Sequence, residues 1–192
     1  GATFSNAYMT GALCSPSRAG LMTGRYQQRF GFDNNLPPRA QTGLDTKEVF
    51  GTKRLKTLGY KTGLIGKWHL GYPAEYHPNE RGFDCFYGLL QGSRSYFPYE
   101  KPTAHRVILE NKTPTKEGGY ITDRFGDAAV KFIDKNKATP FFLFVSFTSP
   151  HGPLQPKKED LSRVAHMQGG RAKNAGLIAS LDDNVGKILA AL

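Results

Sequence analysis

The run Phe141–Phe147 places the strongest constraint on the fold, because it is apolar over its whole length apart from Ser146. A continuous apolar run of strand length is typical of a strand whose two faces are covered by helices in a parallel sheet. We therefore expect residues 141–147 to form a central strand of an α/β fold. Ser149-Pro150-His151-Gly152-Pro153 interrupts the run at its carboxyl end, where open α/β sheets bind their ligands.

The rest of the chain alternates between helical and extended patterns. Apolar residues at helical spacing predict helices over residues 46–58, 123–133 and 177–192. A short strand over residues 60–65 follows the first of these helices. Residues 72–120 are rich in Pro, Gly and Tyr, so we expect mostly loop there, with a strand at 106–109. The segment 4–9 is either a strand or an extended lead into a helix.

Composition limits the partners that this chain can take. With 192 residues and 39% hydrophobic content, it has room for one domain with a full core. No apolar run reaches the roughly 18 residues of a transmembrane helix, and the first residues lack the pattern of a signal peptide. The net charge of +10 suits an anionic partner such as a sulfated polymer. Its lysines and arginines are scattered, so we expect neither nucleic acid nor a membrane as partner.

The segment from Cys14 to Arg25 is the strongest candidate for a reactive site. Ser-Pro-Ser after Cys14 predicts a helix start, which places the cysteine at the positive end of the helix dipole. Arg18 lies four residues later on the same face, and Gly24 is expected to end the helix. The alternative is a cysteine that only packs. Cys14 and Cys85 could also form one disulfide in an oxidising compartment, unless Cys14 is modified.

Lys67, His69 and His151 are further candidates. Lys67 and His69 lie two residues apart in extended chain, so their side chains point to the same side and can offer a charge and a proton-transfer group to one site. A histidine beside Trp68 that merely packs remains the alternative. His151 follows the apolar run and is a weak signal by itself.

Two of these segments resemble elements of the type I sulfatases, members of the alkaline phosphatase superfamily. Residues 14–25 resemble the family's Cys-x-Pro-Ser-Arg-x4-Thr-Gly-Arg element, and residues 59–71 resemble a second element that contains Gly-Lys-Trp-His-Leu-Gly. Pro150-His151-Gly152-Pro153 is similar to a third. The resemblance implies a mixed, largely parallel sheet sandwiched between helices, with residues 1–192 as part of one sulfatase catalytic domain.

The resemblance also implies a chemistry. In this family the cysteine, here Cys14, is oxidised to formylglycine, whose hydrated aldehyde attacks sulfate esters. Arg18 would steady the hydrated group, Lys67 would neutralise sulfate oxygens, and His69 would hydrogen-bond to the hydrated group. His151 would contact the sulfate or protonate the leaving group. The implied partners are a sulfated small molecule or polysaccharide, most simply a sulfated carbohydrate, and a formylglycine-generating enzyme during maturation. A secreted, periplasmic or lysosomal location is implied too.

The implied calcium site departs from the family pattern. Of the expected metal ligands only Cys14 is present, since an Asp-Asp pair on a first strand and a later Asp-Asn pair are absent from residues 1–192. Asp182-Asp183 lies within the last predicted helix, so we expect a solvated helix face there. Two alternatives remain open, namely a non-catalytic relative that binds sulfated glycans and a phosphoester hydrolase of the same superfamily. Without these ligands, loss of activity in an isolated fragment is a third open alternative.

Overall fold

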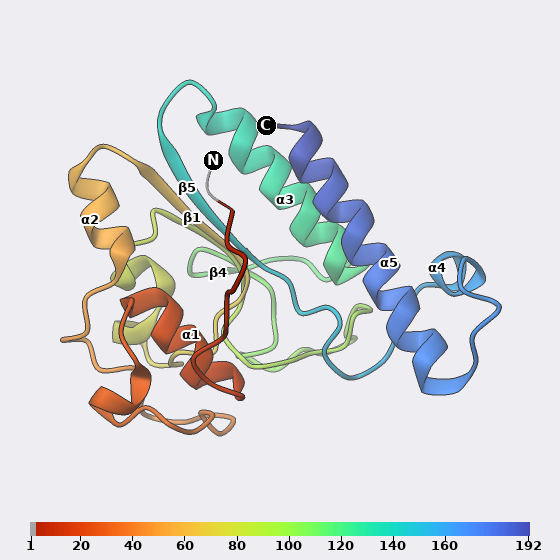
Figure 1. Cartoon of the computed structure of the whole chain (residues 1–192), viewed down its shortest axis with the longest axis horizontal. Helices are drawn as coiled ribbons and strands as arrows, with labels where there is room; N and C mark the ends of the chain where they lie inside the picture. The colour runs from red at the N-terminus through yellow and green to blue at the C-terminus, as the bar shows by residue number, and fades with distance from the viewer. Residues whose placement is uncertain (1–2) are drawn as a thin grey trace.

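The computed structural model describes residues 3–192 and contains a five-stranded mixed sheet between helices (Figure 1). The strand order is β4-β3-β2-β1-β5. β1 pairs in parallel with β2 and β5, whereas β2–β3 and β3–β4 are antiparallel. The strands are β1 (Lys61–Lys67), β2 (Cys85–Leu89), β3 (Leu109–Glu110), β4 (Thr113–Pro114) and β5 (Phe141–Ser146). The mixed, largely parallel sheet predicted from the sequence is confirmed.

Helices cover both faces of this sheet. α3 packs against β1, β2 and β5, and α5 packs on the outer side of α3 (Figure 1). α2 packs on β1, and α1 contacts α2. The helices are α1 (Cys14–Thr23), α2 (Gly51–Thr57), α3 (Ile121–Asn136), α4 (Lys158–Ser162) and α5 (Gly169–Ala190), and short 3-10 turns are Gln27–Phe30, Ala74–Tyr76 and Pro78–Arg81. This order of layers separates two apolar cores.

β1 is the strand on which both cores meet. Leu64 faces the core that includes Trp68 and Phe83, and its neighbour Ile65 faces the core beneath α3, because successive side chains on a strand point to opposite faces. Leu64 is fully buried and Ile65 is 4% exposed. The covered central strand is therefore β1.

Near the carboxyl end of β1, the backbones of neighbouring strands approach so closely that two positions have room only for glycine. A Cβ on Gly66 would lie 2.0 Å from the Ser146 carbonyl oxygen of β5, and one on Gly88 of β2 would lie 1.8 Å from the Gly66 carbonyl oxygen. Gly66 also has a φ of 115°, which favours glycine. The backbones of β2, β1 and β5 therefore lie close together just before Lys67 and His69.

Three expectations from the sequence need correction, and one open alternative is decided. Residues 141–146 form β5, but within residues 3–192 this strand pairs on one side only and is mostly half-buried, so it is not central. β2 lies in the segment that we expected to be loop. The helix expected over 46–58 is only α2, Gly51–Thr57. Segment 4–9 is exposed and contains no strand, so of the two alternatives it is the lead into α1.

Two of the expected helices are confirmed. The helix expected over 123–133 is α3, which extends from Ile121 to Asn136. The last helix is α5, although it begins earlier, at Gly169. None of the helices in the described residues has the length and apolar character needed to cross a bilayer.

Candidate active site

The start of α1 places Cys14 at the first helical position, as the sequence predicted. Leu13 precedes the helix in an extended conformation, and neither Ser15 nor Ser17 caps it. The cap comes from a distant loop, because the Ser15 backbone N–H donates to Asn35 Oδ1 at 2.8 Å. The helix ends at Gly24, whose φ is 66° and whose N–H donates to the Gly20 carbonyl oxygen.

Arg18 connects α1 to the ends of two strands. Its guanidinium donates to the Lys67 carbonyl oxygen at 2.8 Å and to Ser146 Oγ at 2.6 Å. Burial lowers the pKa of Arg18 to about 10, and attraction to Cys14 opposes that change. Arg18 therefore remains a fixed cation next to Cys14 at neutral pH.

Lys67 is a second cation at the same place. It ends β1 and is 3% exposed. Burial lowers its pKa, interaction with Cys14 opposes that change, and repulsion by Arg18 adds to it. A half-buried Arg18 and a buried Lys67 beside a helix N-terminus produce a site that favours an anion.

His69 lies just beyond, in a backbone conformation that is uncommon for a residue with a side chain. Its φ is 62°, and it is 6% exposed. Nε2 lies 3.2 Å from the Leu36 carbonyl oxygen, while Nδ1 is buried and has no hydrogen-bond partner in the part of the chain that is described. Burial, followed by the positive charge of Lys67, lowers the pKa of His69 to about 4. The ring is therefore neutral near pH 7.

His151 is placed differently from these four residues. It follows β5 and is exposed, and its Nδ1 lies 2.7 Å from the Gly152 carbonyl oxygen. Its backbone carbonyl oxygen accepts a hydrogen bond from the buried Tyr96 hydroxyl at 2.8 Å. The charge of His151 is near enough to contribute to the lowered pKa of His69. The structure thus gathers Cys14, Arg18, Lys67 and His69 and leaves His151 on the exposed side of them.

Three residues of this site were not predicted from the sequence. Asn35 caps α1, Leu36 supplies the carbonyl oxygen near His69, and Ser146 accepts a hydrogen bond from Arg18. The sequence indicated only that the loop near 34–38 carries groups able to line a pocket. Ser146 is the one polar residue in the apolar run of β5, which is the signal that could have identified it.

No described residues form a metal site. Residues 3–192 contain no cluster of three or more His, Cys, Asp and Glu side chains able to hold an ion. Asp183 forms an ion pair with Arg163 at 2.6 Å on the exposed surface, as expected for a solvated helix face. Cys14 and Cys85 are both free thiols.

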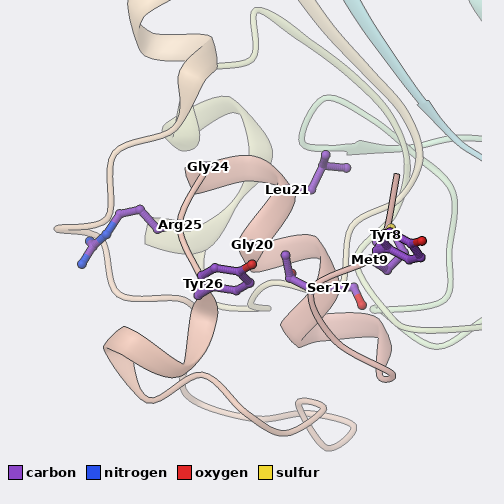
Figure 2. Close-up of a pocket in the computed structure, with 9 residues that line it drawn as sticks. Tyr8, Met9, Ser17, Gly20, Leu21, Gly24, Arg25 and Tyr26 are labelled. Atoms are coloured by element: carbon purple, nitrogen blue, oxygen red, sulfur yellow. The ribbon is translucent and has the colours of Figure 1, made fainter. Parts of the chain in front are cut away.

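A separate pocket of about 310 Å³ adjoins another face of α1 (Figure 2). Tyr8 and Met9 of the N-terminal segment lie on one side of it, and Leu21 and Tyr26 also line it. None of the five predicted site residues contributes to its wall. This pocket is therefore distinct from the site at Cys14.

Comparison with known proteins agrees with the fold. The model of the sulfatase family matches residues 1–192. N-acetylgalactosamine-6-sulfatase from Mus musculus is 31% identical over all of this chain and 40% of its own length. The crystal structure of Ps i-CgsB in complex with k-i-k-neocarrahexaose superposes with a TM-score of 0.92 and 39% identity, over 98% of this chain and 46% of that one. The structure of BT4656 in complex with D-glucosamine-2-N, 6-O-disulfate has a TM-score of 0.67 and 28% identity, over 85% of this chain and 30% of that one.

The chain therefore belongs to the sulfatase family, whose members are sulfuric ester hydrolases. It spans less than half the length of these relatives.

Proposed function

We propose that the full-length protein hydrolyses a sulfate ester of a carbohydrate through a formylglycine made from Cys14. The observation that carries this proposal is the convergence of Cys14, Arg18 and Lys67, where α1 begins and β1 ends. A half-buried and a buried cation at a helix N-terminus are suited to a tetrahedral anion. The family membership supports the same reaction.

The residues present fit a modified side chain at position 14. When formed, formylglycine supplies a hydrated aldehyde as the nucleophile. Arg18 and Lys67 offset the negative charge that develops on the sulfate oxygens; Arg18 is held by two hydrogen bonds and Lys67 is buried before substrate arrives. Neutral His69 can accept a proton at Nδ1, and exposed His151 can donate one to the leaving alkoxide.

Calcium is part of the proposal for the full-length protein, but the described residues do not form its site. Cys14 is the only proposed ligand among them, and no acidic cluster accompanies it. Calcium takes about six to eight oxygen ligands, so a modified Cys14 alone is insufficient to bind it. We assign no step of the reaction to calcium.

The carbohydrate substrate is proposed from the relatives. One is an N-acetylgalactosamine-6-sulfatase, and two have structures in complex with saccharides. Neocarrahexaose is the first oligosaccharide to test, because the protein crystallised with it has the higher identity of the two. A formylglycine-generating enzyme would act on Cys14 before the substrate binds. A secreted, periplasmic or lysosomal location remains part of the proposal.

Peptide mass tests the proposal directly. The peptide with Cys14, from protein expressed together with a maturation enzyme, should be about 18 Da lighter than the thiol form when the aldehyde is unhydrated. The peptide with Cys85 in the same digest is the internal control and should keep its thiol. An unmodified Cys14 would contradict the proposal.

Turnover separates this function from its alternatives. We expect the matured protein to hydrolyse an aryl sulfate and a sulfated oligosaccharide faster than the matching phosphate ester. Preference for the phosphate would indicate a phosphoester hydrolase. Binding of sulfated glycan by matured protein without turnover would indicate a non-catalytic relative.

A further inference from the structure

The ring of His69 is confined by two groups that are not themselves acid-base residues. The Leu36 carbonyl oxygen lies 3.2 Å from Nε2, and Gly92 lies against the imidazole. These groups come from different loops, one following α1 and the other following β2. Each restricts the ring in a different way.

The carbonyl oxygen of Leu36 selects the tautomer. A carbonyl oxygen can only accept a hydrogen bond, so the nitrogen that faces it must carry the proton. In a neutral imidazole the other nitrogen is then the acceptor. That nitrogen is Nδ1, which is buried and has no partner among the described residues. A buried acceptor left without a partner is costly, and this is expected where a substrate or modified side chain supplies the donor.

Gly92 sets the position of the ring. A Cβ built on Gly92 would lie 2.4 Å from Cε1, 2.7 Å from Nδ1 and 2.9 Å from Nε2 of His69. All three distances are shorter than carbon and nitrogen atoms tolerate without bonding. The nearest obstacle is thus the imidazole at the end of a side chain, which can turn away at lower cost than backbone can shift.

We propose that Gly92 and the carbonyl group of Leu36 are positioning elements, which hold His69 in the Nε2-protonated tautomer and leave Nδ1 as the acceptor for the reaction. This inference rests on the proposed function. Any larger residue at position 92 would turn the imidazole, break its contact with Leu36 and misplace Nδ1.

Gly92→Ala tests this proposal in the matured, full-length protein. The matched control is Gly118→Ala, because Gly118 is exposed and a Cβ there would meet no atom within 4 Å. We expect Gly92→Ala to lower kcat by about 100-fold, the loss that follows a small misplacement of a catalytic group, with KM changed less than about twofold. Gly118→Ala should retain the wild-type values.

Nitrogen NMR supplies a readout that does not depend on turnover. In protein with ¹⁵N-labelled histidine, a His69→Gln variant identifies the His69 signals. At pH 6, above the pKa of about 4, wild-type His69 should show a protonated Nε2 and an unprotonated Nδ1. Gly92→Ala should lose this pattern, and Gly118→Ala should keep it.

A double variant covers the case in which Gly92→Ala fails to fold. His69→Gly removes the imidazole, and glycine accepts the φ of 62° at this position. His69→Gly/Gly92→Ala should therefore have the same Tm as His69→Gly, since the two substitutions are coupled through one contact.

Two results would overturn the inference: wild-type kcat in Gly92→Ala, or a His69 nitrogen pattern that the substitution leaves unchanged. A double variant less stable than His69→Gly would also overturn it, because the obstacle would then not be the ring. Wild-type protein without sulfatase activity would contradict the proposed function instead, while the nitrogen spectra would still decide the position of His69.

Discussion

At the scale of single residues, Lys67 shows how burial strengthens the interaction of a cation with an anion. It is 3% exposed at the end of β1, whereas Lys61, at the start of the same strand, is exposed. A cation that is already desolvated loses little solvation when substrate binds, so its interaction with a sulfate is strong.

We therefore expect Lys67→Ala to lower kcat/KM of the full-length protein by about 100- to 1000-fold on an aryl sulfate. Lys61→Ala removes the same charge from the same strand and should leave kcat/KM within about twofold, because an exposed lysine there is screened by solvent. Initial rates at several substrate concentrations give kcat/KM for the two variants. Equal losses would contradict the assigned role of Lys67.

His69 leads to a prediction about pH. Its pKa is about 4 in the fold and 6.5 ordinarily, so between these values the unfolded chain binds more protons than the folded one. The stability that depends on neutral His69 is complete above pH 6.5 and is lost as the pH falls toward 4. Besides burial, the positive charges of Lys67, Arg18 and His151 disfavour a charged ring, and the hydrogen bond to the Leu36 carbonyl group favours it.

The free energy of unfolding should thus fall by up to about 3 kcal/mol from this residue alone as the pH is lowered from 6.5 to 4. Measured by urea denaturation, the free energy of unfolding should change less with pH in His69→Gln than in wild type. His166→Gln alters an exposed histidine and should reproduce the wild-type curve. A His69→Gln curve parallel to wild type would contradict the prediction.

At the scale of elements, α3 and α5 meet at a point with no spare volume. A Cβ on Gly126 of α3 would lie 2.1 Å from Asn184 Oδ1 of α5. Asn184 is itself fixed, because its Nδ2 donates to Asp123 Oδ1 and to the Ser180 carbonyl oxygen, each at 2.8 Å. The amide cannot turn away without losing both bonds.

Gly126→Ala should therefore destabilise the protein by about 1–3 kcal/mol, the usual cost of overpacking. Gly186→Ala lies on exposed α5 surface with no atom within 4 Å, and it should be neutral or stabilise by up to about 1 kcal/mol, since alanine favours helix. Urea midpoints measure both effects. A stabilised Gly126→Ala would show that the two helices can separate freely.

The segment before α2 illustrates how a buried cation shapes an element. Arg81, 1% exposed, donates to the carbonyl oxygens of Leu44, Asp45 and Glu48, and its guanidinium lies 4.3 Å from the centre of the Phe50 ring. The Asp45 carbonyl oxygen also accepts a hydrogen bond from the Glu48 backbone N–H at 3.0 Å, which closes a single turn in this segment. The helix begins only at Gly51, although apolar spacing predicts it from residue 46.

At the scale of the whole molecule, the sequence predicts which faces are covered better than it predicts which strands are neighbours. In β5, Phe142 and Phe144 pack toward one core and Leu143 and Val145 toward the other, as the apolar run indicated. Hydrophobicity reports the covered faces of a strand, whereas its position in the sheet depends on backbone pairing. This is why β5 was expected at the centre.

β2 was missed for a related reason. Its five residues, Cys85–Leu89, contain Gly88, and glycine is depleted in strands. The structure needs glycine there because the Gly66 carbonyl oxygen approaches so closely. A residue that weakens the strand pattern in the sequence is thus required by the packing of the sheet.

The candidate site divides in the same way. Cys14, Arg18, Lys67 and His69 stand in recognisable patterns, so the sequence predicts them as site residues, and the structure places them together. Asn35 and Leu36 contribute through an amide and a backbone carbonyl group that almost any loop possesses, and only the tertiary structure brings them to α1 and His69.

The adjacency of Asn35 and Leu36 has a consequence for how this loop tolerates change. Asn35 binds the first turn of the helix that carries Cys14, and Leu36 binds the ring of His69. Because these two residues are adjacent, a single peptide unit fixes the distance between α1 and His69. Extra residues after Leu36 would leave both contacts in register. A single residue inserted between Asn35 and Leu36 would increase the distance between these two contacts by up to about 3.6 Å, enough to separate Cys14 from His69.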